Sequence, residues 1–424
     1  MKHPYPAIER MAAKVRAAFS GEDSRVPEVF ENCIDDTLEN TVKRMEDGSV
    51  YVITGDIPAM WLRDSTCQLM PYVRFAAQEP GIMDILLGVL ETQARCILLD
   101  PYANAFTVPG TSSIWMSDRT AMKPGLWERK YEIDSLCHPV DLAWTLWKKT
   151  GTTRQFTADW KRAAEVILET FETETDHENK SGYRFERDDC VFTDTLSRDG
   201  KGALVKPGIG LIFSGFRPSD DACVYGYFIP ANMFAAVALE RIGEIAEAVY
   251  GDGALADRAR AFSASLRRAI AEYAILPRTE KPFYAYEVDG FGQYLVMDDA
   301  NIPSLLALPL LGWCEADDAL YLNTREVILS ERNPYYYEGK YLKGIGSPHI
   351  PVRYVWHIAL AVQGLTAASR EEKLDCIRQM VNSDGGTGMM HEGVFVDDPA
   401  RFTRPWFSWA NAMFCELVMD YLDQ

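Results

Sequence analysis

The stretch RPSDDACVYGYFIPANMF at residues 217–234 contains the pattern that decides the fold. Charged and polar residues fill positions 217–221, and the apolar run 228–234 follows after a short connection. An apolar run of this kind is typical of a segment buried in a protein core. We expect the charged cluster to lie at the N-terminal end of a buried helix, where its side chains can face a pocket.

Five further clusters of the same kind precede apolar segments elsewhere in the chain. They read WLRD at 61–64, EID at 132–134, DDAN at 298–301, HIPVR at 349–353 and HE at 391–392. Successive clusters are about 43 to 86 residues apart, which leaves room for one helix out and one helix back at about 1.5 Å per residue. Six such units predict an all-α fold, an (α/α)6 barrel of six helical hairpins with short β elements in its loops.

Helix capping is the alternative explanation for these clusters. Asp, Ser and Asn are the usual residues at helix N-caps, so each cluster alone is about equally well explained as a cap. Arg, Trp and His are not capping residues, however, and six caps do not account for them. We therefore expect all six clusters to face one pocket at one rim of the barrel.

Local patterns along the chain agree with a helical fold. Residues 156–171 and 254–275 predict long helices, and residues 141–150 predict a helix that ends at Gly151. The segment 284–296 is the best candidate for a β-hairpin, because Asp-Gly stands at its centre. Since no linker rich in proline, glycine or serine interrupts the chain, residues 1–424 are expected to form a single catalytic domain.

Composition excludes several kinds of partner. The formal net charge is −19 and the isoelectric point is near 4.8, whereas nucleic acids and anionic membrane surfaces select basic proteins. The densest apolar stretch, 302–314, contains two prolines and is shorter than the roughly 18 apolar residues of a membrane span. We therefore expect neither nucleic acid nor membrane as a partner.

The cysteines and the N-terminus predict a cytoplasmic location. The nine cysteines are an odd, dispersed set without a C-x-x-C motif, which is typical of buried thiols in a reducing compartment. Residues 1–20 have no apolar core of the kind that signal peptides carry, and they predict an amphipathic helix instead.

The residue types in the clusters indicate a sugar as the ligand. Carboxylates and amides exchange hydrogen bonds with hydroxyl groups, and aromatic faces cover the C–H patches of a sugar ring. Hydrolysis of a glycosidic bond needs one protonated and one ionised carboxyl group. Asp220, beside Asp221, and Glu392, in the glycine-rich loop 385–392, are the candidates, although most of the 62 acidic residues are expected at the surface.

Other chemistries lack their motifs. The sequence contains neither a phosphate-binding G-x-x-x-x-G-K-[ST] loop nor a G-x-S-x-G nucleophile elbow. It also lacks closely spaced histidine pairs and the D-x-D-x-D-G calcium loop. We therefore expect no cofactor, while the motifs alone leave a metal site open because carboxylates can bind calcium.

Four segments together resemble glycoside hydrolase family 125. They are GDIPAMWLRDS at 55–65, FRPSDDAC at 216–223, MDDANIPS at 297–304 and MHE at 390–392, and the resemblance runs over nearly the whole chain. It implies an (α/α)6 barrel and an exo-α-1,6-mannosidase that inverts the anomeric carbon without a metal ion. The implied substrate is an oligosaccharide that contains α-1,6-linked mannose.

The resemblance also implies roles for individual residues. Asp220 would be the general acid and Glu392 the general base that activates water, while Arg63 and Asp64 would hold the terminal mannose. From the clusters we expect further contacts to the sugar, made by Trp61, Glu132, Asp134, Arg217, Asp299, Asn301, His349 and Arg353.

Three other functions stay open at the level of sequence. A glycoside phosphorylase on a similar barrel would replace the base and its water by a phosphate site, which Glu392 argues against. Another exo-glycosidase on the same barrel and a non-catalytic sugar-binding scaffold are the remaining alternatives. The scaffold would leave the two carboxyl groups unexplained.

Overall fold

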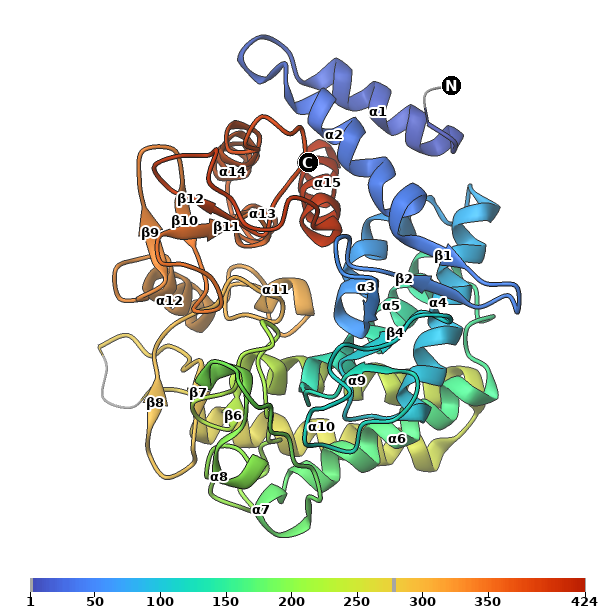
Figure 1. The fold of residues 1–424 in the computed structure, drawn as a ribbon, viewed down its shortest axis with the longest axis vertical. Helices are drawn as coiled ribbons and strands as arrows, with labels where there is room; N and C mark the ends of the chain where they lie inside the picture. The colour runs from blue at the N-terminus through green and yellow to red at the C-terminus, as the bar shows by residue number, and fades with distance from the viewer. Residues whose placement is uncertain (1–2, 277–279, 424) are drawn as a thin grey trace.

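The computed structural model describes residues 3–276 and 280–423. Within these residues the main helices alternate along the chain between an outer and an inner ring, drawn in Figure 1. The outer helices are α2 (Val26–Asp36), α4 (Pro80–Leu99), α6 (Ala158–Glu174), α10 (Gly253–Tyr273), α12 (Ala319–Ile328) and α14 (Arg370–Asn382). The inner helices are α3 (Leu62–Leu69), α5 (Ile133–Thr150), α9 (Ile229–Ile245), α11 (Leu308–Leu311), α13 (His357–Leu365) and α15 (Ser408–Asp423).

The two ends of the chain close the ring. Helix α15 packs against α13, and also against α2 and α3 at the other end of the sequence. Helix α1 (Pro6–Ala18) is the amphipathic helix predicted at the N-terminus, and it covers α2 and α15 from outside. This alternation confirms the predicted (α/α)6 barrel.

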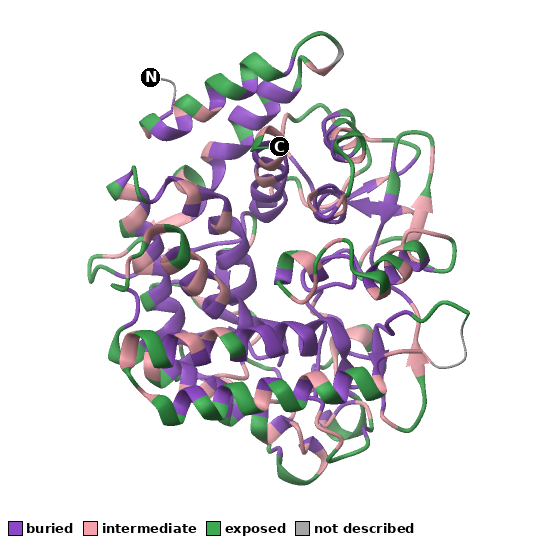
Figure 2. Ribbon diagram, turned by 180° about the vertical axis from the view of Figure 1, so that it is seen from behind, coloured by how far each residue is buried: buried purple, intermediate pink, exposed green. Residues whose placement is uncertain are grey.

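Burial separates the two rings, as Figure 2 shows. Helix α9 is buried along almost its whole length, because its neighbours include α5 on one side and α10 on the other. Helix α10 buries a single stripe, with Leu255, Ala259, Leu266 and Ile270 facing the core at helical spacing. One cluster of buried apolar side chains extends from α1 to α15.

The strands are short and lie in the loops. They form five small antiparallel sheets among the described residues. Their bounds are β1 (Val42–Arg44), β2 (Val50–Val52), β3 (Ala59–Trp61), β4 (Ala105–Thr107), β5 (Leu126–Glu128), β6 (Tyr227–Phe228), β7 (Glu287–Val288), β8 (Tyr294–Leu295), β9 (Tyr336–Glu338), β10 (Lys343–Ile345), β11 (Tyr354–Trp356) and β12 (Gly393–Phe395).

The remaining helical turns are short or irregular. Helix α7 (His177–Lys180) and α8 (Ser197–Gly200) have four residues each, and α8 contains two left-handed residues. Tighter or wider turns are η1 (Gly21–Asp23), η2 (Thr37–Thr41), η3 (Met70–Phe75), η4 (Phe192–Asp194) and η5 (Ala246–Tyr250).

Most local predictions are confirmed. Helices α6 and α10 occupy the predicted stretches, and α5 ends at Gly151, whose φ of 75° is the left-handed conformation that glycine tolerates. Strands β7 and β8 form the predicted hairpin around Asp289 and Gly290. All nine cysteines carry free thiols. Among the helices of residues 3–276 and 280–423, none combines the length and apolar character needed to cross a bilayer.

Two clusters depart from the predicted position directly before an inner helix. Residues 298–301 precede a loop and then α11, which has four residues only. Residues 391–392 lead into β12, and α15 starts after a further loop. In both places a loop separates the cluster from its inner helix. Asn301 and Glu392 nevertheless line the same cavity as residues of the other clusters.

Candidate active site

A cavity of about 310 Å3 opens where the inner helices begin. Its walls combine carboxylates, arginines and aromatic rings, and they come from segments spread over most of the chain. The lining residues are Thr54, Ile57, Trp61, Arg63, Asp64, Pro218, Ser219, Asp220, Asn301, His349, Trp356, Glu392, Arg404, Phe407 and Trp409.

Asp220 reaches this cavity from a tight turn. Two backbone hydrogen bonds close the turn: the N–H of Arg217 donates to the carbonyl of Asp221, and the N–H of Asp220 donates to the carbonyl of Arg217. Asp220 itself has a φ of 67°. A left-handed residue other than glycine costs roughly 1–3 kcal/mol, and such conformations cluster at functional sites. The indole Nε1 of Trp61 and the amide of Asn104 donate to Oδ1 of Asp220 over 3.4 and 3.0 Å. The side chain is therefore held toward the cavity.

Arg63 organises the acidic groups on one side of the cavity. It is almost completely buried, and its Nη1 donates to Glu132 over 2.7 Å and to Asp134 over 3.0 Å. Its Nη2 lies 3.7 Å from Oδ1 of Asp220. Burial raises the pKa of Asp134 to about 6, although Arg63 opposes the shift. Helices α3 and α5 pack against each other, which brings these residues together.

Glu132 and Asp220 both face the amide of Asn104, whose nitrogen lies 3.4 Å from Oε1 of Glu132 and 3.0 Å from Oδ1 of Asp220. Burial raises the pKa of Glu132 well above its usual range, and the charges of Asp220 and Asp134 add to this rise against the opposing Arg63. For Asp220 burial also favours the neutral form, but the charges of Lys130 and Arg63 outweigh it and lower its pKa to about 2.

Glu392 stands in a rigid loop. The ring of His391 stacks on Phe402 with centroids 3.7 Å apart, and its two nitrogens lie 3.1 Å from the carbonyl oxygens of Arg404 and Asp384. Burial raises the pKa of Glu392, while the nearby charges of Arg404 and His349 counteract the rise. Its carboxylate is thus buried, with a pKa that burial raises and that two cations hold back.

Arg404 is the first of these cations. Its Nη1 lies 3.9 Å from Oε1 of Glu392, and its Nε bonds both carboxylate oxygens of Asp56 over 3.0 and 3.2 Å. Its φ of 48° is a second left-handed conformation in the cavity wall. Asp56 and Thr54 thus orient a guanidinium toward the base and the cavity.

In the structure the predicted residues fall into three groups: those that line the cavity, those buried behind its wall and one that lies outside it. Seven of them line the cavity: Trp61, Arg63, Asp64, Asp220, Asn301, His349 and Glu392. Glu132, Asp134, Arg217 and Asp299 are buried behind the wall. Arg353 lies outside the cavity, where its guanidinium pairs with Asp397.

The residues behind the wall still support it. Arg217 donates to Glu287 over 2.6 Å, which ties the turn of Asp220 to strand β7. Asp299 accepts a hydrogen bond from Ser219 over 3.3 Å. Each of these four side chains is engaged with a neighbouring side chain and does not line the cavity, so its contact with the ligand stays a prediction.

Eight lining residues were not predicted at the level of sequence. Pro218 and Ser219 stand in the cluster of Asp220, Trp356 comes shortly after the cluster 349–353, and five others remain. They are Thr54, Ile57, Arg404, Phe407 and Trp409. Thr54 and Ile57 lie just before the WLRD cluster. Arg404 and Phe407 belong to the segment that leads into α15, and Trp409 lies in the first turn of that helix. An arginine between Thr403 and Pro405 belongs to no motif that would predict a site residue. Arg404 lies near Glu392 only because of how the chain packs where the ring closes.

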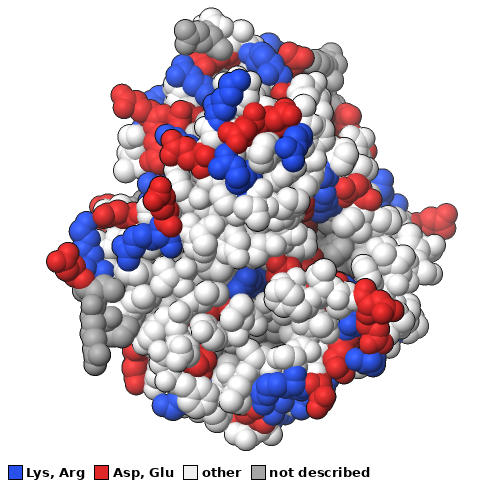
Figure 3. All heavy atoms as spheres, turned by 60° about the vertical axis from the view of Figure 1, so that its left-hand side comes forward, with Lys and Arg blue, Asp and Glu red and all other residues white. Residues whose placement is uncertain are grey.

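No group of three or more metal-binding side chains occurs in the part of the chain that the structure describes. The charge of the surface is mixed, and Figure 3 shows acidic and basic groups interspersed around a hollow on one face. Neither feature points to a metal-dependent reaction or to a polyanionic ligand.

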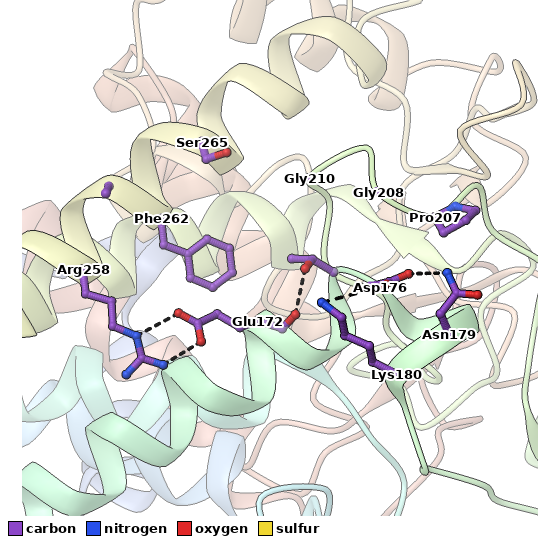
Figure 4. A pocket seen from close by; sticks show the side chains of 12 residues that line it. Glu172, Asp176, Asn179, Lys180, Pro207, Gly208, Gly210, Arg258, Phe262 and Ser265 are labelled. Atoms are coloured by element: carbon purple, nitrogen blue, oxygen red, sulfur yellow. Dashed lines mark hydrogen bonds and ion pairs between the residues drawn. The ribbon is translucent and has the colours of Figure 1, made fainter.

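A larger hollow of about 760 Å3 lies elsewhere, between α6, α7 and α10 (Figure 4). Its charged groups are paired with one another. Nε and Nη2 of Arg258 donate to the two carboxylate oxygens of Glu172 over 2.8 and 2.6 Å, and Asn179 donates to Asp176 over 2.7 Å. It shares no lining residue with the first cavity, which remains the candidate active site.

Comparison with known families decides the class of this site. The family model described as metal-independent α-mannosidase (GH125) matches residues 23–419. The chain belongs to this family. This GH125 protein is therefore a glycoside hydrolase of the α-mannosidase class, as the sequence predicted.

Two relatives support the assignment. A metal-independent α-mannosidase of Streptococcus pneumoniae, solved as a non-productive complex with α-1,6-mannobiose, is 45% identical over the full length of both chains with a TM-score of 0.95. The meiotically up-regulated gene 157 protein of Schizosaccharomyces pombe is 41% identical over 95% of this chain and 83% of its own length.

A more distant structure shares the fold alone. A bacterial glucoamylase in complex with acarbose has a TM-score of 0.56 at 13% identity, over 86% of this GH125 chain and 49% of its own. Such low identity carries no information about the substrate of the GH125 protein.

Proposed function

We propose that this GH125 protein is an exo-acting α-1,6-mannosidase that releases the non-reducing terminal mannose with inversion. One observation carries the proposal: two carboxyl groups, Asp220 and Glu392, line the same cavity together with tryptophans and arginines. At about 310 Å3 the cavity lies at the small end of the range for ligand pockets, about 300–1,000 Å3, which favours a terminal sugar over an internal one.

Asp220 is proposed as the general acid. It protonates the glycosidic oxygen as the bond to the anomeric carbon breaks. The neighbouring Asp221 does not line the cavity and bonds to His349 instead, which supports Asp220 as the donor. A pKa of about 2 in the empty site means that Asp220 must receive a proton before each turnover.

Glu392 is proposed as the general base. It takes a proton from a water molecule that attacks the anomeric carbon from the face opposite the leaving group. A raised pKa makes a carboxylate a stronger base at neutral pH, while Arg404 and His349 keep it ionised. In an inverting enzyme the two carboxyl groups stand roughly 6.5–9.5 Å apart, so that this water fits between them.

The remaining lining residues are proposed to bind the terminal mannose. Arg63, Asp64 and Asn301 offer hydrogen-bonding groups, and Trp61, Trp356 and Trp409 offer aromatic faces for the C–H patches of the ring. Residues 1–424 are proposed to act as one catalytic domain, since the cavity takes residues from positions 54 to 409. The mannobiose held by the S. pneumoniae relative supports the 1,6 linkage.

A product assay tests the proposal. The protein is incubated with α-1,6-, α-1,2- and α-1,3-mannobiose, and the anomer that is first released is followed by proton NMR. Release of β-mannose from the 1,6 isomer is expected. Initial α-mannose would contradict inversion, release only from another isomer would contradict the linkage, and a requirement for phosphate would identify a phosphorylase.

A further inference from the structure

Two loops beside the proposed acid keep large apolar side chains in contact with solvent. Ile114 and Met116 are exposed on the first loop, and Val191 and Phe192 on the second, where Phe192 is 87% exposed. Exposed apolar side chains are ordinary when they are scattered, but a gathering of them marks an interaction site. The two loops are far apart in the sequence, and buried charges connect both of them to the turn of Asp220.

The second loop is bonded directly to the turn of the proposed acid. The backbone N–H of Ala222 donates to the carbonyl of Thr193 over 2.7 Å. The ammonium group of Lys130 is almost completely buried; it donates to the carbonyl oxygen of Asp220 over 2.8 Å and pairs with the carboxylate of Asp194. A buried charge keeps its partners because leaving it unpaired is costly, so the second loop keeps its position relative to the acid.

Arg187 connects the first loop to the same carboxylate. Its Nη1 donates to Asp194 over 2.8 Å, and its Nε and Nη2 donate to the two carboxylate oxygens of Asp118 over 2.9 and 2.7 Å. Its guanidinium lies over the ring of Trp115, 3.7 Å from the centroid. Trp115 in turn packs against the buried cluster that contains Trp61, a residue of the cavity wall. Both loops are thus fixed beside the rim of the cavity.

The chemistry of the proposed reaction places the leaving group on this side of the cavity. The proposed acid protonates the glycosidic oxygen, so the leaving group departs past Asp220. The cavity of about 310 Å3 has room for the terminal sugar, and the rest of the glycan therefore continues over the rim. Aromatic and apolar side chains can cover the C–H faces of its sugars.

We infer that the two loops form an outer binding surface for the sugars that follow the leaving mannose, with Phe192 as its platform. The inference rests on the proposed function. An α-1,6 linkage contains one more rotatable bond than a linkage to a ring hydroxyl, so each further sugar is flexible in solution. Binding must offset the loss of that freedom, and a surface that is already rigid has no ordering cost of its own. Longer substrates should therefore bind more tightly than the disaccharide.

Chain-length dependence tests the inference. Initial release of mannose from α-1,6-linked mannobiose, mannotriose and mannotetraose is measured for the wild type, Phe192→Ala, Phe192→Tyr and Leu322→Ala. Leu322 is an exposed apolar residue on the outer helix α12 and serves as the matched control. In the wild type, kcat/KM should rise about two- to tenfold from the disaccharide to the trisaccharide, mainly through KM. Phe192→Ala should lose most of this rise, whereas Phe192→Tyr and Leu322→Ala should keep it.

Three results would overturn the inference. The first is a wild type without the rise, and the second is a Phe192→Ala variant that keeps it. The third is an octyl α-1,6-mannobioside that gains as much as the trisaccharide, because the surface would then select any apolar group rather than a sugar. Melting temperatures confirm that the variants are folded.

Binding measurements separate this inference from the proposed function. If the wild type releases no mannose from any of these substrates, the proposed function is wrong, and calorimetric titration then tests the surface alone. The trisaccharide should bind more tightly than the disaccharide to the wild type and to Leu322→Ala, but not to Phe192→Ala. Equal affinities of the wild type for the two sugars would overturn the inference and leave the assignment of acid and base in place.

Discussion

His349 and Asp221 form an ion pair in the wall of the cavity, with Nδ1 of the imidazole 3.2 Å from Oδ1 of the carboxylate. Burial disfavours the charged imidazole, but the bond to Asp221 and the charges of Asp221, Glu392 and Asp220 outweigh it and raise the pKa of His349 to about 9. The ring is therefore a cation at neutral pH. Its charge favours the ionised form of both the proposed acid Asp220 and the proposed base Glu392.

Replacing Asp221 by asparagine should lower the pKa of His349 toward or below about 6.5, because burial then acts without its counter-charge. A group whose pKa is raised on folding stabilises the fold below its unfolded value and loses this contribution as the pH rises through the folded value. The stability difference between the wild type and Asp221→Asn should therefore narrow between about pH 6.5 and pH 9. NMR titration of the histidine signals and melting temperatures against pH measure both effects; a constant difference would contradict the assignment.

Removing Arg404 should move the activity of the enzyme to higher pH. The guanidinium counteracts the rise in the pKa of Glu392, so Arg404→Ala should raise that pKa further. The base must be ionised, hence the acid limb of kcat/KM should shift upward by about one unit or more. The full pH profile on α-1,6-mannobiose measures this.

Arg258 provides a matched control for Arg404. It also donates two hydrogen bonds to a carboxylate, that of Glu172. It lies on α10, however, in the hollow between α6, α7 and α10. Arg258→Ala should leave the pH profile in place. A shift of equal size in both variants would indicate a general effect of net charge.

The proposed carboxyl pair predicts a specific pattern of lost activity. Asp220→Asn and Glu392→Gln should each lower kcat on α-1,6-mannobiose by about 10²–10⁴-fold with little change in folding. Asp221→Asn should keep more activity than Asp220→Asn, since Asp221 acts on His349. Steady-state kinetics with melting temperatures as a control measure this. An inactive Asp221→Asn beside an active Asp220→Asn would reverse the assignment of the acid.

Asn232 on α9 anchors the segment that leads to Asp220. Its side chain accepts from the N–H of Ile212 over 2.8 Å and donates to the carbonyl of Ile212 over 3.0 Å. Asn232→Ala would leave both buried groups unpaired, at about 1–3 kcal/mol for each. We expect roughly 2–4 kcal/mol less stability in urea unfolding. The half-buried Asn323→Ala on α12 is the control and should cost under about 1 kcal/mol. Equal losses would contradict the anchoring role.

The fold was predictable because the clusters repeat. Inner helices α3, α5, α9 and α13 all begin at or just after a charged cluster, and this regularity is visible in the sequence. The short sheets were less predictable, since strands of two or three residues carry no periodicity. The inner helix predicted after residues 298–301 has only the four residues of α11, because prolines break the apolar run that contains it.

The site was predictable where chemistry and cluster coincide. Asp220, Glu392 and Arg63 stand in clusters and line the cavity. Burial decided the remainder: Glu132 stands in a cluster but lies behind the wall, and Arg353 pairs with Asp397 outside it. Arg404 lies in no cluster, and it reaches the cavity only through tertiary packing that the sequence does not encode locally.

The closure of the ring by α15 has a consequence for the synthesis of the enzyme on the ribosome. The proposed acid precedes α9 in mid-chain, whereas the proposed base and Arg404 precede α15, which must dock between α13 and α3. A nascent chain that has completed its first four hairpins already contains the proposed acid Asp220, yet it lacks the proposed base Glu392. Activity begins only with the arrival of the last helix, so a fragment released by premature termination is inert toward glycans.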